Sequence, residues 1–138
     1  MRNLSGKAAV LVAALVVAAA AAADTPASIA DGYAAAAKRE VPGFSGFSAQ
    51  RGAQFFRSTH GNDWSCASCH TADPAKPGRH ARTGVDLQPL APAAKADRFT
   101  DLAKVEKWFR RNCNDVVGRE CTVQEKGDVL AFLMQAGR

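Results

Sequence analysis

The stretch Cys66-Ala67-Ser68-Cys69-His70 lies near the middle of this 138-residue chain and forms a C-x-x-C-H motif. Each of the two cysteines can add its thiol to one vinyl group of a haem, and the histidine that follows can bind the iron as the proximal ligand. We therefore predict that Cys66 and Cys69 attach one haem c covalently and that His70 ligates its iron.

Two other uses of such a motif are less favoured. A structural zinc site needs a second pair of ligands at close spacing, and the later cysteines, Cys113 and Cys121, are separated by seven residues. A thioredoxin-like dithiol belongs to a βαβ unit, and no run of Val and Ile precedes Cys66.

The N-terminus has the pattern of an export signal. Arg2 and Lys7 carry positive charge, and residues 8–22 consist of Ala, Val and Leu only. This apolar run of about 15 residues is shorter than the ~20 that span a bilayer. We predict a signal peptide over residues 1–23, cleaved after Ala23, with an uncleaved membrane anchor as the alternative. Export to the periplasm, an oxidising compartment in which disulfides persist, is then expected.

Charge excludes one class of partner. The chain has 18 Lys+Arg and 13 Asp+Glu, and removal of Arg2 and Lys7 leaves 16 against 13, a net charge of +3. Two haem carboxylates would reduce this further, and the basic residues form no block, so no nucleic-acid partner is predicted. A modest positive face suits only transient docking, to an acidic redox partner or at a membrane surface.

The residues after the signal, 24–138, suffice for one domain, and their pattern predicts an all-α fold with no strand. Ser28 or Asp31 would lie near the start of the first helix. Thr100 or Asp101 would cap the third, and Thr122 with Glu125 forms a capping box for the last. Residues 73–97 contain four prolines and predict a long loop along one edge of the haem. The expected helices are residues 27–40, 48–58, a stretch from about 100 to the Cys113 region, and 123–135.

The order of these helices resembles the class I cytochrome c fold. In that fold an N-terminal and a C-terminal helix cross at close range. Gly52 would permit such an approach because it has no side chain, and Phe56 would pack against Phe132.

A methionine is a less favoured second axial ligand of the iron. Met134 is the only methionine after residue 23, and its place late in the final helix predicts a core residue. His60 and His80 are candidates, although His60 would reach the distal face only with difficulty. Asn112 and Asn114, on either side of Cys113, are further candidates. A Cys113–Cys121 bridge would either hold this segment near the iron or only stabilise a small domain.

Several segments resemble one known family. The stretch from Lys104 to Cys121, with its run Arg111-Asn112-Cys113-Asn114, is similar to the sphaeroides haem protein (SHP) family of Asn-ligated cytochromes c. The similarity continues through residues 125–133 and extends to the C-x-x-C-H motif and to residues 81–84, 89–92 and 97–100. It covers most of residues 28–135, and relatives of this kind are also catalogued as a domain of unknown function.

The resemblance implies a ligand set and partners. His70 would be the proximal ligand, Asn112 the distal ligand, and Cys113–Cys121 a disulfide beside it. The preference for Asn112 over Asn114 rests on this resemblance alone. It also implies a dihaem cytochrome c and a membrane cytochrome b as electron donors.

Ligand chemistry then suggests a function. An amide oxygen is a hard donor that suits Fe(III) and binds Fe(II) poorly, so reduction should release Asn112 and open a site for O2, NO or another diatomic ligand. Terminal oxidoreductase activity toward O2 or nitrogen oxides is one form of this function. The alternatives are a conventional low-potential electron carrier and a non-catalytic gas-binding or sensing module.

Overall fold

The computed structural model describes residues 22–138. The predicted signal peptide, apart from Ala22 and Ala23, therefore lies outside the described residues. None of the helices between residues 22 and 138 combines the length and the apolar character that a bilayer crossing requires.

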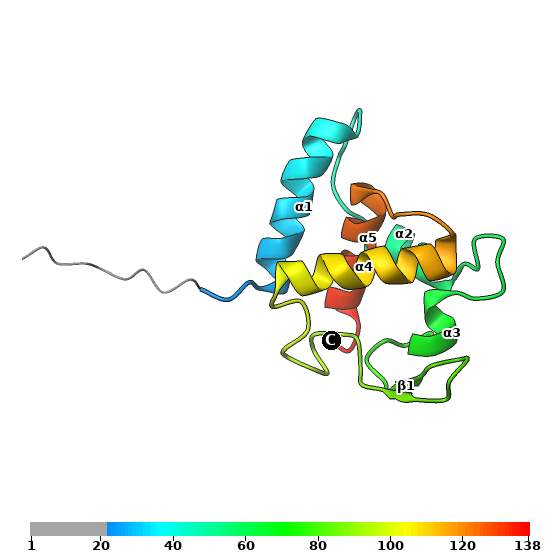
Figure 1. Ribbon diagram of the computed structural model, residues 1–138. Coiled ribbons are helices and arrows are strands. Elements are labelled where there is room, and N and C mark those ends of the chain that lie inside the picture. Colours follow the sequence, from blue (N-terminus) through cyan, green and yellow to red (C-terminus); the bar gives the residue numbers. More distant parts are fainter. Residues whose placement is uncertain (1–21) are drawn as a thin grey trace, which may run out of the picture.

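Five helices make up about half of the described chain, and four of them are helices that the sequence predicts (Figure 1). The prediction of no strand was wrong, because two strands of two residues each pair antiparallel within the proline-containing loop. Such short strands leave no alternating pattern in the sequence, and the turn that joins them is closed by His80 N–H donating to the Val85 carbonyl at 2.8 Å. The elements are α1 (Pro26–Glu40), α2 (Ala49–Arg57), α3 (Cys66–His70), β1 (Gly78–Arg79), β2 (Asp86–Leu87), α4 (Leu102–Val117) and α5 (Val123–Gln135).

Side-chain caps fix where the helices begin. The expected helix over residues 27–40 is confirmed within one residue, with Thr25 as its cap and Ser28 near its start. Ser28 is the reciprocal partner in a capping box, and Pro26 occupies the first turn, where its missing N–H costs nothing. Asp101 rather than Thr100 caps α4, and the predicted Thr122 capping box of α5 is confirmed.

The closest packing in the molecule is the crossing of α2 and α5. A Cβ atom added to Gly52 would lie 1.9 Å from the backbone oxygen of Asp128, so only glycine fits there. One turn further on, the rings of Phe56 and Phe132 pack with centroids 5.4 Å apart, as predicted. The buried Asp128 carboxylate accepts hydrogen bonds from Ser48 N–H and from the Arg51 guanidinium, which ties the start of α2 to α5.

Helix α4 crosses in front of α5 in Figure 1, with α3 below its later half. Near its middle, the Glu106 carboxylate accepts from the Tyr33 hydroxyl of α1 at 2.5 Å and from Lys126 Nζ of α5 at 2.7 Å. At its start, Leu102 N–H donates to a carboxylate oxygen of Asp24 at 2.8 Å. These contacts and a disulfide hold α4 across a cavity from α3.

Candidate haem site

Helix α3 is a single turn that presents the C-x-x-C-H motif. Ser65 caps it in a capping box with Ser68, which fixes the two middle residues of the motif in helical conformation. Cys66 and Cys69 are three positions apart in this turn and therefore lie on one side of it. Burial raises the pKa of the Cys66 thiol to about 11, so this side chain is a neutral thiol at pH 7.

The surroundings of the second cysteine are tightly constrained. A Cβ atom added to Gly78 would lie 2.1 Å from the Cys69 carbonyl oxygen, so β1 can pass this close only because it has glycine there. Ala81 N–H, in the turn after β1, donates to Cys69 Sγ at 3.2 Å. The β1–β2 hairpin thus holds the end of the motif.

His70 ends α3 as a neutral imidazole. Burial lowers its pKa, and the positive charge of Arg98 lowers it further. The neutral ring has a free lone pair, which is the form that binds a metal. Thr71, directly after it, adopts the left-handed region at φ 61°, an uncommon conformation for a residue other than glycine, and turns the chain away.

Two cavities lie between α3 and α4, with volumes of about 190 and 110 Å³. Both are lined by Cys66, His70 and Asn112, so they form one space divided in two. Helix α3 supplies one side of this space and α4 the other. The larger part has apolar walls made of Phe55, Phe56, Leu90, Phe99, Val105, Trp108, Phe109, Val129 and Leu133.

The two asparagines of α4 point in different directions. Asn112 lines both cavities, and Phe109 and Trp108, three and four positions earlier on the same helix face, line the larger one. Asn114 lines neither, because residues two positions apart do not share a helix face. The structure thus places Asn112 opposite His70, and its role as an iron ligand stays a prediction.

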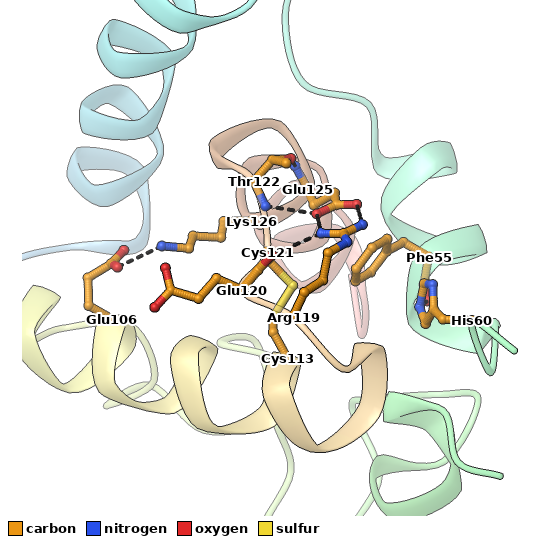
Figure 2. The surroundings of a disulfide bond; sticks show 10 residues. All are labelled: Phe55, His60, Glu106, Cys113, Arg119, Glu120, Cys121, Thr122, Glu125 and Lys126. Atoms are coloured by element: carbon orange, nitrogen blue, oxygen red, sulfur yellow. Dashed lines mark hydrogen bonds and ion pairs between the residues drawn. A yellow bond between two sulfur atoms is a disulfide. The ribbon is translucent and has the colours of Figure 1, made fainter. Parts of the chain in front are cut away.

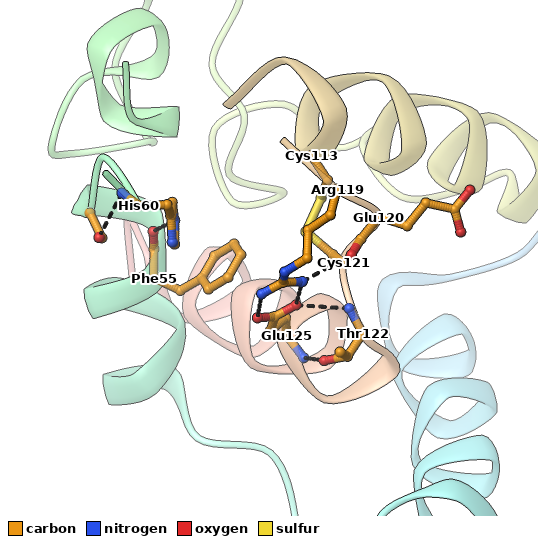
Figure 3. Close-up of polar contacts among 9 residues, drawn as sticks. Phe55, His60, Cys113, Arg119, Glu120, Cys121, Thr122 and Glu125 are labelled. Carbon is orange, nitrogen blue, oxygen red and sulfur yellow. Dashed lines mark hydrogen bonds and ion pairs between the residues drawn. A yellow bond between two sulfur atoms is a disulfide. The ribbon is translucent and has the colours of Figure 1, made fainter. Parts of the chain in front are cut away.

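The other candidate ligands are also separated by their positions. Met134 packs in the core against the cluster of Ile29, Tyr33 and Leu130, as predicted, and lines neither cavity. His60 Nε2 lies 2.9 Å from the Phe55 carbonyl oxygen and its ring packs on Phe55, away from both cavities (Figure 3).

His80 does line the smaller cavity. Its Nδ1 accepts hydrogen bonds from the backbone N–H groups of Arg82 and Thr83 at 3.3 and 3.2 Å. Of the three histidine and methionine candidates for the second axial position, His80 alone shares a cavity with Asn112.

A disulfide joins Cys113, next to Asn112, to Cys121 at the start of α5 (Figure 2). Both sulfurs are in buried residues. A second contact fixes the segment between the two cysteines to α5. The Arg119 guanidinium pairs with both carboxylate oxygens of Glu125, at 2.7 and 2.8 Å. Glu125 also accepts from Thr122 N–H at 2.8 Å, which completes the α5 cap (Figure 3).

The residues present fit a covalent haem. The space offers two thiols, an imidazole and an amide, and much of the wall of its larger part is apolar or aromatic. Trp108 is a wall residue that is 50% exposed, and a flat apolar group bound in the space would cover such a ring. Two cations, Arg98 and Lys104, and two acids, Asp97 and Asp101, also line the larger cavity.

Sequence reasoning included residues 97–100 in the family resemblance but assigned no role to Arg98 and Phe99. Phe99 has φ 58°, which is a true outlier for a bulky side chain, and such strain is concentrated at functional sites. Its ring packs against both core clusters and lines the larger cavity. Propensities gave no signal for this conformation, because nothing about Phe99 favours the left-handed region.

Sequence comparisons connect the chain to known proteins. Residues 42–133 match the family model described as a domain of unknown function, DUF1924. The chain is 45% identical over 128 residues to the cytochrome c-type protein SHP of Cereibacter sphaeroides, which covers 90% of this chain and 94% of that protein. It is 43% identical over 79 residues to cytochrome c'' of Methylophilus methylotrophus, which covers 57% of this chain and 55% of that protein.

Structural comparisons agree. The structure of oxidized SHP, described as an oxygen-binding cytochrome c, matches with a TM-score of 0.70 and 49% identity over 80% of this chain and 96% of that one. The crystal structure of oxidized cytochrome c'' from Methylophilus methylotrophus matches with a TM-score of 0.73 and 34% identity, over 82% and 95% of the two chains. The family match spans the C-x-x-C-H motif, Asn112 and both disulfide cysteines.

Proposed function

The chain belongs to the SHP family, and on that premise we propose that it binds a diatomic ligand at a haem held by His70 and Asn112. It is a c-type cytochrome with one covalently bound haem c, and it has the predicted all-α, class I cytochrome c fold. Asn112 would ligate the ferric iron of a bound haem, and reduction would favour its release because an amide oxygen suits Fe(II) poorly. The space that Asn112 leaves would then admit O2, NO or a similar molecule.

The observation that carries this proposal is the shared cavity of His70 and Asn112. They approach it from opposite helices, α3 and α4, while Asn114, Met134 and His60 line neither part of it. Cys66 and Cys69 would hold the macrocycle by its vinyl groups between the two helices.

Once bound, the haem supplies an iron that exchanges single electrons and accepts axial ligands. Asn112 contributes a hard amide oxygen, a donor suited to Fe(III) and poor for Fe(II). The same side chain has an NH2 group, and after release this group can donate a hydrogen bond to a molecule in the cavity. The disulfide at Cys113 and the aromatic rings of Trp108 and Phe109 restrict how far the Asn112 backbone can move and keep the space apolar.

Two relatives, SHP and cytochrome c'', support this proposal. The solved SHP is an oxygen-binding cytochrome c, and the solution structure of cytochrome c'' from Methylophilus methylotrophus concerns haem-ligand detachment. The proposed place of action is the periplasm, with a dihaem cytochrome c and a membrane cytochrome b as electron donors. Turnover of O2 or nitrogen oxides by this protein as a terminal oxidoreductase is part of the same proposal.

A conventional electron carrier is the second candidate, and His80 is the observation that favours it. His80 lines the smaller cavity with Asn112, and a histidine that stays bound in both redox states would leave no open position. Binding of CO to the reduced protein separates the two functions, because a six-coordinate carrier with two strong ligands does not take it up. Catalytic consumption of O2 or NO in the presence of a reductant separates an oxidoreductase from a gas-binding module.

The test compares absorption and EPR spectra of Asn112→Ala, Asn114→Ala and His80→Ala in both redox states. Asn112→Ala should convert the ferric protein to a high-spin spectrum, while the other two variants keep the wild-type spectrum. A wild-type ferrous state that remains low-spin and refuses CO would refute ligand release. A ferric spectrum changed by His80→Ala and unchanged by Asn112→Ala would assign the sixth position to His80.

A further inference from the structure

Tyr33 is the single tyrosine of the chain, and it is buried beside a carboxylate. Its hydroxyl donates to Glu106 Oε1 at 2.5 Å, while Oε2 of the same carboxylate accepts from Lys126 Nζ at 2.7 Å. Burial and the bond to Glu106 raise the pKa of the Tyr33 phenol. Against the effect of burial, hydrogen bonds from Lys126 and Tyr33 lower the pKa of Glu106. The resting pair is therefore a protonated phenol held on a carboxylate anion.

One aromatic ring separates Tyr33 from the haem cavity. The rings of Tyr33 and Phe109 meet edge to face with their centroids 6.3 Å apart, and Phe109 lines the larger cavity. Electrons pass between redox groups through a single packed side chain without any movement of atoms. The phenol is thus within electron-transfer reach of a haem in the cavity, although it does not line the cavity itself.

Trp108 lines the larger cavity directly, but it is a poorer electron donor than Tyr33. The Arg111 guanidinium carbon lies 5.7 Å from the centroid of the Trp108 ring, and its positive charge opposes the radical cation that an oxidised indole becomes. Lys126 Nζ lies at a similar distance, 5.9 Å, from the Tyr33 ring. Tyr33 stays neutral when it is oxidised, however, if its proton leaves together with its electron.

We propose that Tyr33 donates an electron to the bound haem during reduction of a hydroperoxide, and that Glu106 accepts the phenolic proton in the same step. Breakage of the O–O bond of hydrogen peroxide to give two waters requires two electrons and two protons. One electron comes from the reduced haem, as Fe(II) becomes Fe(III), and solvent supplies the two protons. The second electron comes from Tyr33, which becomes a neutral phenoxyl radical while its own proton moves to Glu106 Oε1.

The proton transfer needs no rearrangement of side chains. It follows the existing hydrogen bond, which has the short reach that proton transfer between positioned groups requires, and Lys126 keeps the other oxygen of Glu106. One further electron from a donor and return of the proton then restore Tyr33. The inference rests on the proposed function in one respect, because peroxide must find an open position on the reduced iron. Hydroperoxides are reduction products of O2, so a haem that binds O2 meets them.

The experiment mixes reduced holoprotein with an equal concentration of hydrogen peroxide, without other reductants, and measures the peroxide consumed per haem oxidised. In the wild type Tyr33 supplies every second electron, so each haem should consume about one peroxide. In Tyr33→Phe both electrons must come from haems, and the consumption should fall about twofold. Glu106→Gln should show the same fall, because an amide does not take up the phenolic proton. Trp108→Phe is the matched control and should keep the wild-type value.

Freeze-quench EPR of the wild type, with its tyrosine deuterated on the ring, identifies the radical without any variant. Because the chain has one tyrosine, a signal narrowed by deuteration belongs to Tyr33. A signal that deuteration leaves unchanged would overturn the inference, and so would equal peroxide consumption in wild type and Tyr33→Phe. A fall in Trp108→Phe alone would make Trp108 the donor. A reduced haem that neither binds CO nor reacts with peroxide would refute the proposed function as well, whereas CO binding without a Tyr33 radical overturns this inference only.

Discussion

The two sides of the haem cavity are built in different ways. On one side, α2 crosses α5 in direct contact, with Gly52 against the Asp128 backbone and Phe56 against Phe132. On the other side, α4 packs on the core through Val105 and Phe109 and is otherwise attached through a few separate links. These links are the carboxylates of Asp24 and Glu106 and the Cys113–Cys121 disulfide.

This difference bears on where movement is tolerated. The α2–α5 crossing is continuous packing, so a change there disturbs the whole core. Helix α4, which carries Asn112, can respond to a change in the cavity without repacking α2 against α5. Such an attachment suits Asn112, which in the proposed function must leave its position and return. It also predicts that removing one link at a time lowers the free energy of unfolding by a different amount for each link.

The largest expected effect comes from Gly52→Ala. The added Cβ would stand 1.9 Å from the Asp128 oxygen and 2.4 Å from its carbon, and both are backbone atoms that cannot rotate away. We expect a loss of about 3 kcal/mol or more in the free energy of unfolding, or no folded protein. Guanidinium titration followed by circular dichroism measures this.

Gly32→Ala is the matched control. Gly32 lies in the interior of α1, and a Cβ there meets nothing within 4 Å. Alanine should stabilise the helix by about 0.5–1 kcal/mol, the opposite sign. If both substitutions destabilised the protein to a similar degree, close approach at Gly52 would not be the reason.

Removal of the disulfide should have the next largest effect. In Cys113→Ser/Cys121→Ser the unfolded chain regains the freedom of a nine-residue loop, which corresponds to about 2.5 kcal/mol. Thermal unfolding with and without a thiol reductant measures it, since the reductant should destabilise the wild type and leave the double variant unchanged. A double variant as stable as the wild type would mean that Arg119 and Glu125 alone hold the end of α4.

The sequence predicted correctly those features that depend on the spacing of a few neighbouring residues or on the absence of a side chain. The C-x-x-C-H motif, the Thr122 capping box and the Gly52–Phe56–Phe132 crossing each depend on local spacing or on a missing side chain, and all are present as expected. Spacing alone could not distinguish Asn112 from Asn114. Only the direction of each side chain from α4 does so, and that direction depends on how the helix is placed.

The remaining features depend on contacts between distant residues. The pairing of β1 with β2 comes from closure of a turn, and the strained Phe99 from packing against two core clusters. Asp24 lies 78 positions from the helix that it caps. No local pattern carries such information, because these residues gain their roles only when the chain is folded.

An intermediate effect is expected for Glu106→Gln, which removes the charge that links α4 to α1 and α5. Burial alone would raise the pKa of Glu106, but the hydrogen bonds from Lys126 and Tyr33 outweigh it and hold the pKa below its ordinary value of 4.5. The charged form therefore stabilises the folded state above pH 4.5, and this contribution is lost as the pH falls through the lowered pKa. We expect a loss of about 1–2 kcal/mol at pH 7.

Unfolding free energies of the wild type and Glu106→Gln at pH 7 and below pH 4.5 check the sign. The difference should diminish in acid, because the wild-type side chain then becomes neutral too. Glu120→Gln is the control, since Glu120 is 74% exposed and lies 3.9 Å from Arg110, where an ion pair contributes little. A difference between wild type and Glu106→Gln that grows in acid would contradict the link.

The smallest effect is expected at the start of α4. Asp24 is the first residue after the predicted cleavage position, and its carboxylate adds to the Asp101 cap by accepting from Leu102 N–H. Asp24→Ala should cost about 0.5–1 kcal/mol, and Asp24→Asn less, because an amide oxygen still accepts but adds no charge near the helix N-terminus. Hydrogen exchange of the Leu102 amide is the most direct measure, with protection lost in Asp24→Ala and largely kept in Asp24→Asn. If Leu102 exchanges equally in all three proteins, the first residues after the signal do not hold α4, and the Asp101 cap, Glu106 and the disulfide carry that helix alone.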